Sequence, residues 1–231
     1  MTARQKAWSP WMKDRTGLNP PAYLVVEGPV GVGKTSLVRR LAESFGGETL
    51  LEKAEENPFL ERFYQDRRQA ALPTQLFFLF QRSNQLQALR QRDMFRSALV
   101  ADFMLEKDPL FARVNLDEHE LRLYEQVYAQ LTLDAPSPDL VVYLQAPAET
   151  LMQRINKRGR REEQTMEPGY LQKLCDAYAE FFYYYNKSPL LIVNATDINP
   201  VEREADYRLL LEQICSVRSG KHYFNPAPVL V

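Results

Sequence analysis

The segment from Tyr23 to Leu37 constrains the fold of this chain most, because it joins an apolar strand pattern to a glycine-rich turn and the start of a helix. It reads Tyr-Leu-Val-Val-Glu-Gly-Pro-Val-Gly-Val-Gly-Lys-Thr-Ser-Leu and contains the pattern G-x-x-x-x-G-K-T. In such a turn the backbone N–H groups surround phosphate oxygens, and the lysine reaches the terminal phosphates. The residues that we predict to hold the phosphates of ATP are Gly28, Pro29, Val30, Gly31, Val32, Gly33, Lys34, Thr35 and Ser36.

Five apolar runs along the chain have the length and composition of buried parallel strands. They are residues 23–27, 49–52, 98–102, 140–144 and 190–194. The segments between them favour Leu, Gln, Arg and Glu, which suit helices. This alternation predicts an α/β fold of the P-loop NTPase type, with a parallel five-stranded sheet, helices on both faces and an arginine-rich lid.

The length of 231 residues suits one domain, and no linker divides the chain. We expect an N-terminal arm over residues 1–22, a domain over 23–216 and a C-terminal tail over 217–231. The formal net charge of −1 argues against a nucleic-acid or membrane-surface binder, which would show a basic excess. Cys175 and Cys215 lack metal-site spacing and are interpreted as reduced thiols of a cytoplasmic protein.

Two long helices are predicted from their patterns. The first runs from Gln75 to Arg92, with Pro73 just before it as a helix start. Gln75 and Arg82 are seven residues apart, so they project from the same face of that helix. The second runs from about Pro168 to Asn186, and its apolar aromatic stripe is typical of a core or a subunit contact.

Two carboxylates follow predicted strands, where open parallel sheets bind their ligands. Asp102 can hold Mg²⁺ together with the Thr35 hydroxyl, although a loop or helix-cap role would also explain an Asp there. Glu52 can accept the proton of an attacking hydroxyl. Because Glu55 and Glu56 follow it, a solvated acidic loop is the alternative.

Arginines cluster after the fourth predicted strand, at Arg154, Arg158, Arg160 and Arg161 around Gly159. Cations on a helix end and a glycine-containing loop suit a mobile lid over transferring phosphates, with an exposed basic face as the alternative. Residues 51–56 carry one lysine and three acids, so this region favours a neutral hydroxyl acceptor over a phosphate acceptor.

Taken together, these residues resemble the deoxynucleoside kinase family, especially its bacterial deoxyadenosine/deoxyguanosine kinases. The resemblance covers roughly Ala22 to Ile214. The segments that carry it are Glu27–Thr35, Leu51–Phe59, Gln75–Arg82, Asp102–Asp108 and Arg154–Glu163.

The resemblance implies an ATP- and Mg²⁺-dependent kinase that phosphorylates the 5′-hydroxyl of a small deoxynucleoside, and a homodimer. Glu52 would be the general base, and Asp102 would help to hold Mg²⁺. Tyr64 and Glu163 would contact the sugar 3′-hydroxyl. The residues implied to bind the nucleobase are Gln75, Arg82 and Asp108, and those implied to bind the donor phosphates are Lys34, Arg154, Arg158 and Arg160.

Two positions depart from the family pattern. Phe103 stands where members often carry an arginine, and Lys53 stands where the residue after the base is often proline. Deoxyadenosine and deoxyguanosine are the favoured acceptors, with deoxycytidine left open. The alternatives are a nucleoside monophosphate kinase, such as a thymidylate kinase, and a nucleotide-switch protein. The chain lacks the N-K-x-D pattern of a GTPase switch.

Overall fold

The computed structural model describes residues 19–90, 97–131, 136–160, 163 and 165–226. Its strands are β1 (Tyr23–Glu27), β2 (Glu48–Leu50), β3 (Leu99–Ala101), β4 (Leu140–Gln145), β5 (Leu190–Asn194) and β6 (Lys221–Phe224). Its α-helices are α3 (Lys34–Phe45), α4 (Leu60–Gln65), α5 (Arg67–Arg90), α6 (Asp108–Asn115), α7 (Glu118–Leu131), α8 (Ala148–Arg158), α9 (Pro168–Tyr184) and α10 (Glu204–Ser216). Short 3₁₀ turns are η1 (Ala54–Glu56) and η2 (Leu105–Lys107).

All strand pairs of the sheet are parallel, in the order β2-β3-β1-β4-β5-β6. The carboxyl ends of the strands therefore share one edge. β1 is central, and every one of its residues is buried, as expected for a strand covered on both faces. Chain order reverses on either side of β1, which places a ligand crevice beyond its carboxyl end.

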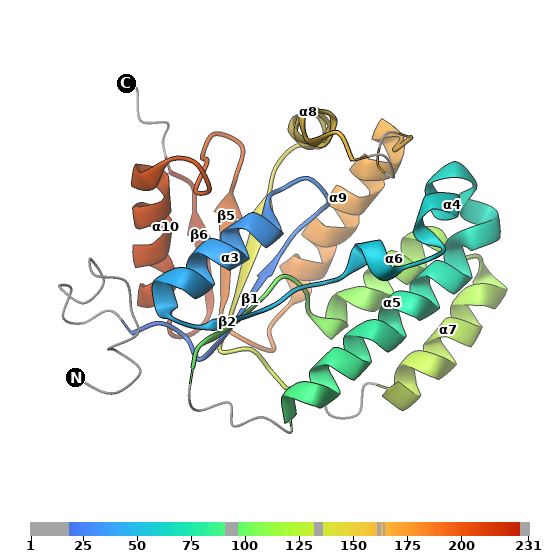
Figure 1. Cartoon of the computed structure of the whole chain (residues 1–231), viewed down its shortest axis with the longest axis horizontal. Coiled ribbons are helices and arrows are strands. Elements are labelled where there is room, and N and C mark those ends of the chain that lie inside the picture. The colour runs from blue at the N-terminus through green and yellow to red at the C-terminus, as the bar shows by residue number, and fades with distance from the viewer. Residues whose placement is uncertain (1–18, 91–96, 132–135, 161–162, 164, 227–231) are drawn as a thin grey trace.

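Helices cover both faces of the sheet, as the sequence pattern predicts (Figure 1). On one side lie α3 and α10, where the Tyr207 hydroxyl of α10 donates a hydrogen bond to the Arg40 carbonyl of α3 at 3.0 Å. On the other side lie α5, α6, α7 and α9. The aromatic stripe of α9 packs into the core, where the Phe182 ring stacks on Tyr143 of β4 at 4.3 Å between ring centroids.

The apolar interior forms two clusters. The larger cluster surrounds the sheet together with α3, α9 and α10. The smaller cluster joins α5, η2, α6 and α7, and its buried residues are Leu79, Leu86, Leu89, Phe103, Leu105, Ala112 and Tyr124. We call these the sheet core and the helical core. The chain contributes to both cores just after β3, because Met104 belongs to the sheet core while Phe103 and Leu105 belong to the helical core.

The predicted strand count of five is wrong, because the sheet has six strands. The sixth, β6, lies in the segment interpreted as a C-terminal tail and pairs with β5 at the edge of the sheet. Its sequence Lys-His-Tyr-Phe is exposed or half-buried and shows no apolar run, so pattern reasoning had no signal for it. Residues 1–18 of the predicted arm and 227–231 of the tail lie outside the described residues.

The predicted start of the long helix at Gln75 is also wrong. The helix α5 begins at Arg67 and contains Pro73 within it. Ala70 and Ala71 are fully buried in the sheet core, so tertiary packing holds this first part of the helix despite the missing N–H of the proline. None of the helices in the described residues is long and apolar enough to cross a bilayer.

Candidate active site

The glycine-rich turn after β1 wraps the amino end of α3, as the motif predicts. Gly28, Gly31 and Gly33 all have positive φ angles, of 148°, 86° and 101°. A Cβ at Gly28 would lie 2.3 Å from the Leu144 carbonyl oxygen, so the turn fits against β4 only without a side chain. The turn therefore leads directly into the amino end of α3, whose free N–H groups and positive dipole end suit an anion.

Lys34 is held by the turn itself. Its Nζ donates hydrogen bonds to the carbonyl oxygens of Gly28 at 2.7 Å and Pro29 at 3.2 Å. Burial, together with the nearby Lys107 ammonium, lowers the pKa of Lys34 to about 8, although neighbouring carboxylates oppose this shift. An amine in this position gains from an incoming phosphate, which supplies a full negative charge in place of two carbonyl dipoles.

Asp102 joins the ends of β2 and β3 to the phosphate turn. Its Oδ2 accepts a hydrogen bond from the Thr35 hydroxyl at 2.6 Å, and its Oδ1 accepts one from the Glu52 backbone N–H at 2.7 Å. A buried carboxylate beside a hydroxyl at the phosphate turn is the kind of oxygen pair that Mg²⁺ uses along with phosphate oxygens. The residues present therefore fit the predicted metal.

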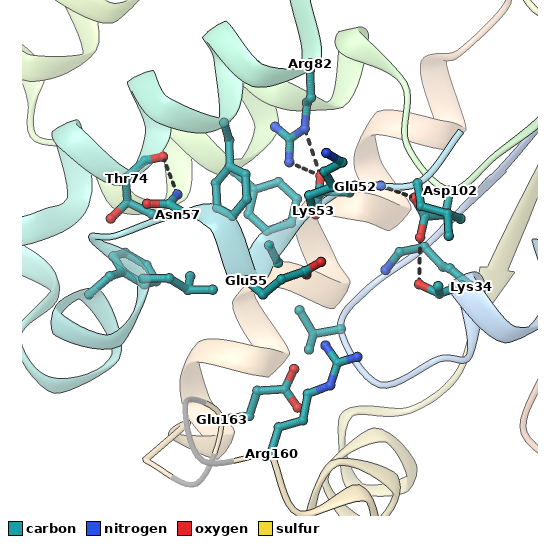
Figure 2. Close-up of a pocket in the computed structure, with 18 of the residues that line it drawn as sticks. Lys34, Glu52, Lys53, Glu55, Asn57, Thr74, Arg82, Asp102, Arg160 and Glu163 are labelled. Carbon is teal, nitrogen blue, oxygen red and sulfur yellow. Dashed lines mark hydrogen bonds and ion pairs between the residues drawn. The ribbon is translucent and has the colours of Figure 1, made fainter. Parts of the chain in front are cut away.

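Glu52 lies at the centre of an ion-pair network (Figure 2). Its Oε1 accepts a hydrogen bond from Arg82 Nε at 2.8 Å and also contacts Arg82 Nη2. Arg82 Nη1 pairs with Asp108, which accepts a further hydrogen bond from the Tyr124 hydroxyl at 2.7 Å. Burial alone would raise the pKa of Glu52, but the charges of Arg82 and Lys107 outweigh it and lower this pKa to about 2. Glu52 is therefore a carboxylate at neutral pH.

Two further charged residues of the site were missed by sequence reasoning. Lys107 is 2% exposed, and its Nζ lies 3.3 Å from Glu27 Oε1 and 3.4 Å from Glu52 Oε1. Glu27 is fully buried at the end of β1, and this burial raises its pKa although Lys107 and Lys34 oppose the shift. It also accepts a hydrogen bond from the Met104 N–H at 2.9 Å. Lysines are rarely buried, so the pattern around Lys107 gave no sign of this contact.

These groups open into a cleft of about 1010 Å³ at the carboxyl edge of the sheet. Of the predicted phosphate-binding residues, its walls include Val30, Gly31, Lys34 and Thr35. At the far end, α5 presents Thr74, Gln75 and Phe78. Thr74 Oγ1 and Gln75 Oε1 are buried and have no hydrogen-bond partner within the described residues. This end of the cleft therefore offers polar atoms that suit the edge of a planar polar ligand.

Described residues at and just after the end of α8 line the opposite side of the cleft. Arg158 pairs with Glu163, which is 8% exposed, and both line the cleft together with Arg160 and Tyr64. Figure 2 shows Arg160 and Glu163 across the cleft from Glu52 and Asp102. The structure thus brings the predicted sugar-contacting and phosphate-contacting groups to one cavity.

Arg154 does not join this group. Its Nη2 donates hydrogen bonds to the carbonyl oxygens of Ala195 at 2.7 Å and Thr196 at 3.2 Å, in the loop after β5. It is absent from the described lining of the cleft, although it stands one helical turn before Arg158. In this structure Arg154 connects α8 to the neighbouring loop.

The two departures from the family pattern also have clear positions. Phe103 is fully buried in the helical core, so this position supplies no charge to the cleft. Lys53 is exposed, and its Nζ pairs with Glu56 at 2.8 Å. Lys53 therefore lies at the solvent-exposed margin of the cleft, and its ion pair among the described residues is with Glu56 and not with Glu52.

Comparison with known proteins agrees with this geometry. Residues 24–217 match the deoxynucleoside kinase family. A deoxyguanosine kinase of Bacillus subtilis is 35% identical over 162 residues, which cover 70% of this chain and 78% of the relative. A deoxyadenosine/deoxycytidine kinase of the same organism is 28% identical over 206 residues, which cover 85% of this chain and 93% of the relative.

A solved structure of a deoxynucleoside kinase has a fold similar to that of this chain. Deoxyadenosine kinase from M. mycoides with bound dATP superposes with a TM-score of 0.74 at 28% sequence identity, covering 84% of this chain and 99% of that one. The same kinase with bound dCTP gives a TM-score of 0.70. The cleft described above therefore lies in a fold whose solved relatives bind deoxynucleotides.

Proposed function

This chain belongs to the deoxynucleoside kinase family, and from that premise we propose that it transfers the γ-phosphoryl group of ATP to the 5′-hydroxyl of deoxyadenosine or deoxyguanosine. The observation that carries this proposal is the half-buried Glu52 carboxylate, which lies in one cleft between the phosphate turn and the polar end of the cleft that α5 forms. A charged base beside a phosphate cradle suits a neutral alcohol as acceptor.

The reaction follows from the positions of the chain's own residues. Lys34 and the N–H groups of the phosphate turn hold the donor phosphates, and Arg158 and Arg160 approach them from the lid. The acceptor oxygen forms its bond to the γ-phosphorus as the bond to ADP breaks, and Glu52 takes the hydroxyl proton. Because charges of neighbouring cations keep the pKa of Glu52 low, we place this proton transfer late, as a loose transition state allows.

Mg²⁺, when bound, would neutralise charge on the donor phosphates. We assign its protein ligands to Thr35 and Asp102, because their oxygens lie 2.6 Å apart at the foot of the phosphate turn. The arrangement suits Mg²⁺, which retains water and phosphate oxygens and needs few protein ligands.

We assign the nucleobase to the end of the cleft lined by Gln75 and Arg82, where the fully buried Asp108 holds Arg82 from behind, and the sugar 3′-hydroxyl to Tyr64 and Glu163. The unpaired Gln75 Oε1 supports the base assignment, because a buried acceptor without a partner gains from a ligand N–H. Replacing Gln75 with Leu should therefore change the order of preference among nucleosides while ATP binding stays constant. An unchanged order would contradict the assignment.

A homodimer is our expectation for the assembly. Phe80 of α5 and Leu123 of α7 are 46% and 48% exposed on neighbouring helices, which gives an apolar surface for a second copy. We also place the protein in the cytoplasm, where ATP is available and the free thiols of Cys175 and Cys215 stay reduced.

The function is tested with a panel of acceptors. Purified protein receives ATP, Mg²⁺ and one of deoxyadenosine, deoxyguanosine, deoxycytidine, thymidine or thymidine monophosphate, and the products are separated by chromatography. We expect deoxyadenosine or deoxyguanosine to give the highest kcat/KM. Turnover of thymidine monophosphate alone would favour a monophosphate kinase, and turnover of no nucleoside would refute the proposal.

A further inference from the structure

Lys107 is a buried cation that the proposed mechanism does not yet use. It is 2% exposed, yet it lines the active-site cleft. Its Nζ lies between the carboxylates of Glu27 and Glu52, at 3.3 and 3.4 Å. Burying an ammonium is costly unless it is paired, so the fold fixes this cation in place through these two acids.

The two cations that pair with Glu52 differ in whether a bound nucleoside would also contact them. Arg82 donates two N–H groups to Glu52 and another to Asp108, and it is also our proposed nucleobase contact. A nucleobase that forms hydrogen bonds with Arg82 competes with Glu52 for the same guanidinium group. We give Lys107 no such second role, because its ion pairs among the described residues are with these two acids.

The position after Asp102, where the family often carries an arginine, supplies no cation to Glu52. Phe103 directly follows Asp102, but its ring is fully buried in the helical core. Among the described residues, the ion pairs of the Glu52 carboxylate are those with Arg82 and Lys107. When Arg82 engages a nucleobase, Lys107 is therefore the cation that remains with Glu52.

We propose that Lys107 is a positioning residue for phosphoryl transfer, which anchors Oε1 of Glu52 so that Oε2 faces the acceptor hydroxyl. This inference rests on the proposed role of Glu52 as the base. In the transfer step the hydroxyl proton moves to Glu52 Oε2 while the new O–P bond forms and the bond to ADP breaks. Lys107 takes no part in this proton transfer and holds the carboxylate in line.

The test compares Lys107→Met with Lys107→Arg in the full chain, using radiolabelled ATP so that slow variants remain measurable. Loss of the anchor should reduce kcat by roughly 10- to 100-fold, the cost of a small misplacement of a reacting group, with KM for ATP and nucleoside within about threefold. The arginine variant should recover most of kcat. Lys173→Met is the matched control, because Lys173 is exposed on α9 and is not among the residues that line the cleft, and it should keep wild-type kcat.

A double-mutant cycle separates positioning from a purely structural role. In a Glu52→Gln background, Lys107→Met should change kcat by less than about threefold, because the carboxylate that it anchors is gone. The same loss in both backgrounds, or a near wild-type kcat for Lys107→Met, would overturn the inference. Near-normal turnover by Glu52→Gln alone would instead remove the proposed base, so the two failures are distinguishable.

The single lysine variant leaves Glu27 buried without its cation and can fail to fold for that reason. The cycle is then repeated in a Glu27→Gln background, where a neutral amide replaces the stranded carboxylate. Lys107→Met should still reduce kcat there, because its contact with Glu52 is independent of Glu27. If kcat in this background does not depend on Lys107, the ammonium serves only to neutralise Glu27 and the inference is wrong.

Discussion

Replacing Arg82 with Met should strongly destabilise the folded protein, because it isolates a buried charge. The side chain of Arg82 is 4% exposed and pairs with Asp108, whose side chain is 0% exposed. After the change, the side-chain hydrogen bond that Asp108 keeps among the described residues is the one from the Tyr124 hydroxyl at 2.7 Å. The loss of Arg82 should destabilise the Glu52 carboxylate less than that of Asp108, because Glu52 is 21% exposed and still contacts Lys107.

The expected loss is about 3–5 kcal/mol in the free energy of unfolding, the usual cost of removing one partner from a buried ion pair. A domain has about 5–15 kcal/mol in total, so this loss is a large part of its stability. With a urea m-value on the order of 2 kcal/mol per molar, the unfolding midpoint should fall by roughly 1.5–2.5 M.

Urea unfolding followed by circular dichroism measures this change. The double variant Arg82→Met/Asp108→Asn should recover much of the loss, because the isolated charge is then neutral. Arg122→Met is the control, since its pair with Glu118 is exposed and should be worth less than about 1 kcal/mol. A single variant within 1 kcal/mol of wild type, or a double variant no more stable than the single one, would contradict this reasoning.

Three further predictions concern Glu52 and the phosphate turn. Glu52→Gln should lower kcat roughly 10²- to 10⁴-fold in the kinase assay with ATP affinity by calorimetry almost unchanged; a kcat near wild type would exclude it as the base. Since its folded pKa is about 2, below the ordinary 4.5, Glu52 stabilises the fold above pH 4.5 and this contribution is lost as pH falls toward 2. Between pH 5 and 3 wild type should lose about 2 kcal/mol more in urea unfolding than Glu52→Gln, and equal losses would refute this. Gly28→Ala should weaken ATP binding at least about tenfold because its Cβ would lie 2.3 Å from the Leu144 carbonyl oxygen, whereas Gly169→Ala, with nothing within 4 Å, should bind ATP normally.

The parts of the fold with a strong local pattern could be predicted from the sequence. The phosphate turn, the strand-end positions of Glu52 and Asp102, and the shared face of Gln75 and Arg82 all follow from spacing within one or two neighbouring elements. β6 could not be predicted, because an exposed edge strand carries no apolar run. The start of α5 was placed too late, because packing of Ala70 and Ala71 overrides the local signal of a proline.

The network inside the site depends on contacts that no local pattern encodes. Arg82 and Glu52 are 30 residues apart in sequence, and Lys107 meets Glu27 across the segment after β3. Family resemblance supplied Arg82 and Asp108 as nucleobase contacts but gave no role to Lys107. The buried charges could be identified only once the fold brought β1, β2 and α5 together.

Because the interior is divided into two cores, the phosphate turn and the proposed acceptor end of the cleft rest on different sets of packed side chains. Sequence changes in one core can therefore alter one part of the cleft without the other. The phosphate turn is built on the sheet core, whereas Tyr124 of the helical core donates a hydrogen bond to Asp108, which holds the proposed nucleobase contact Arg82. Changes in the packing of α5 against α7 can therefore reshape acceptor recognition while the ATP cradle keeps its form. A lineage of such proteins can acquire a new nucleoside preference by repacking one small group of side chains and leave the chemistry of phosphoryl transfer intact.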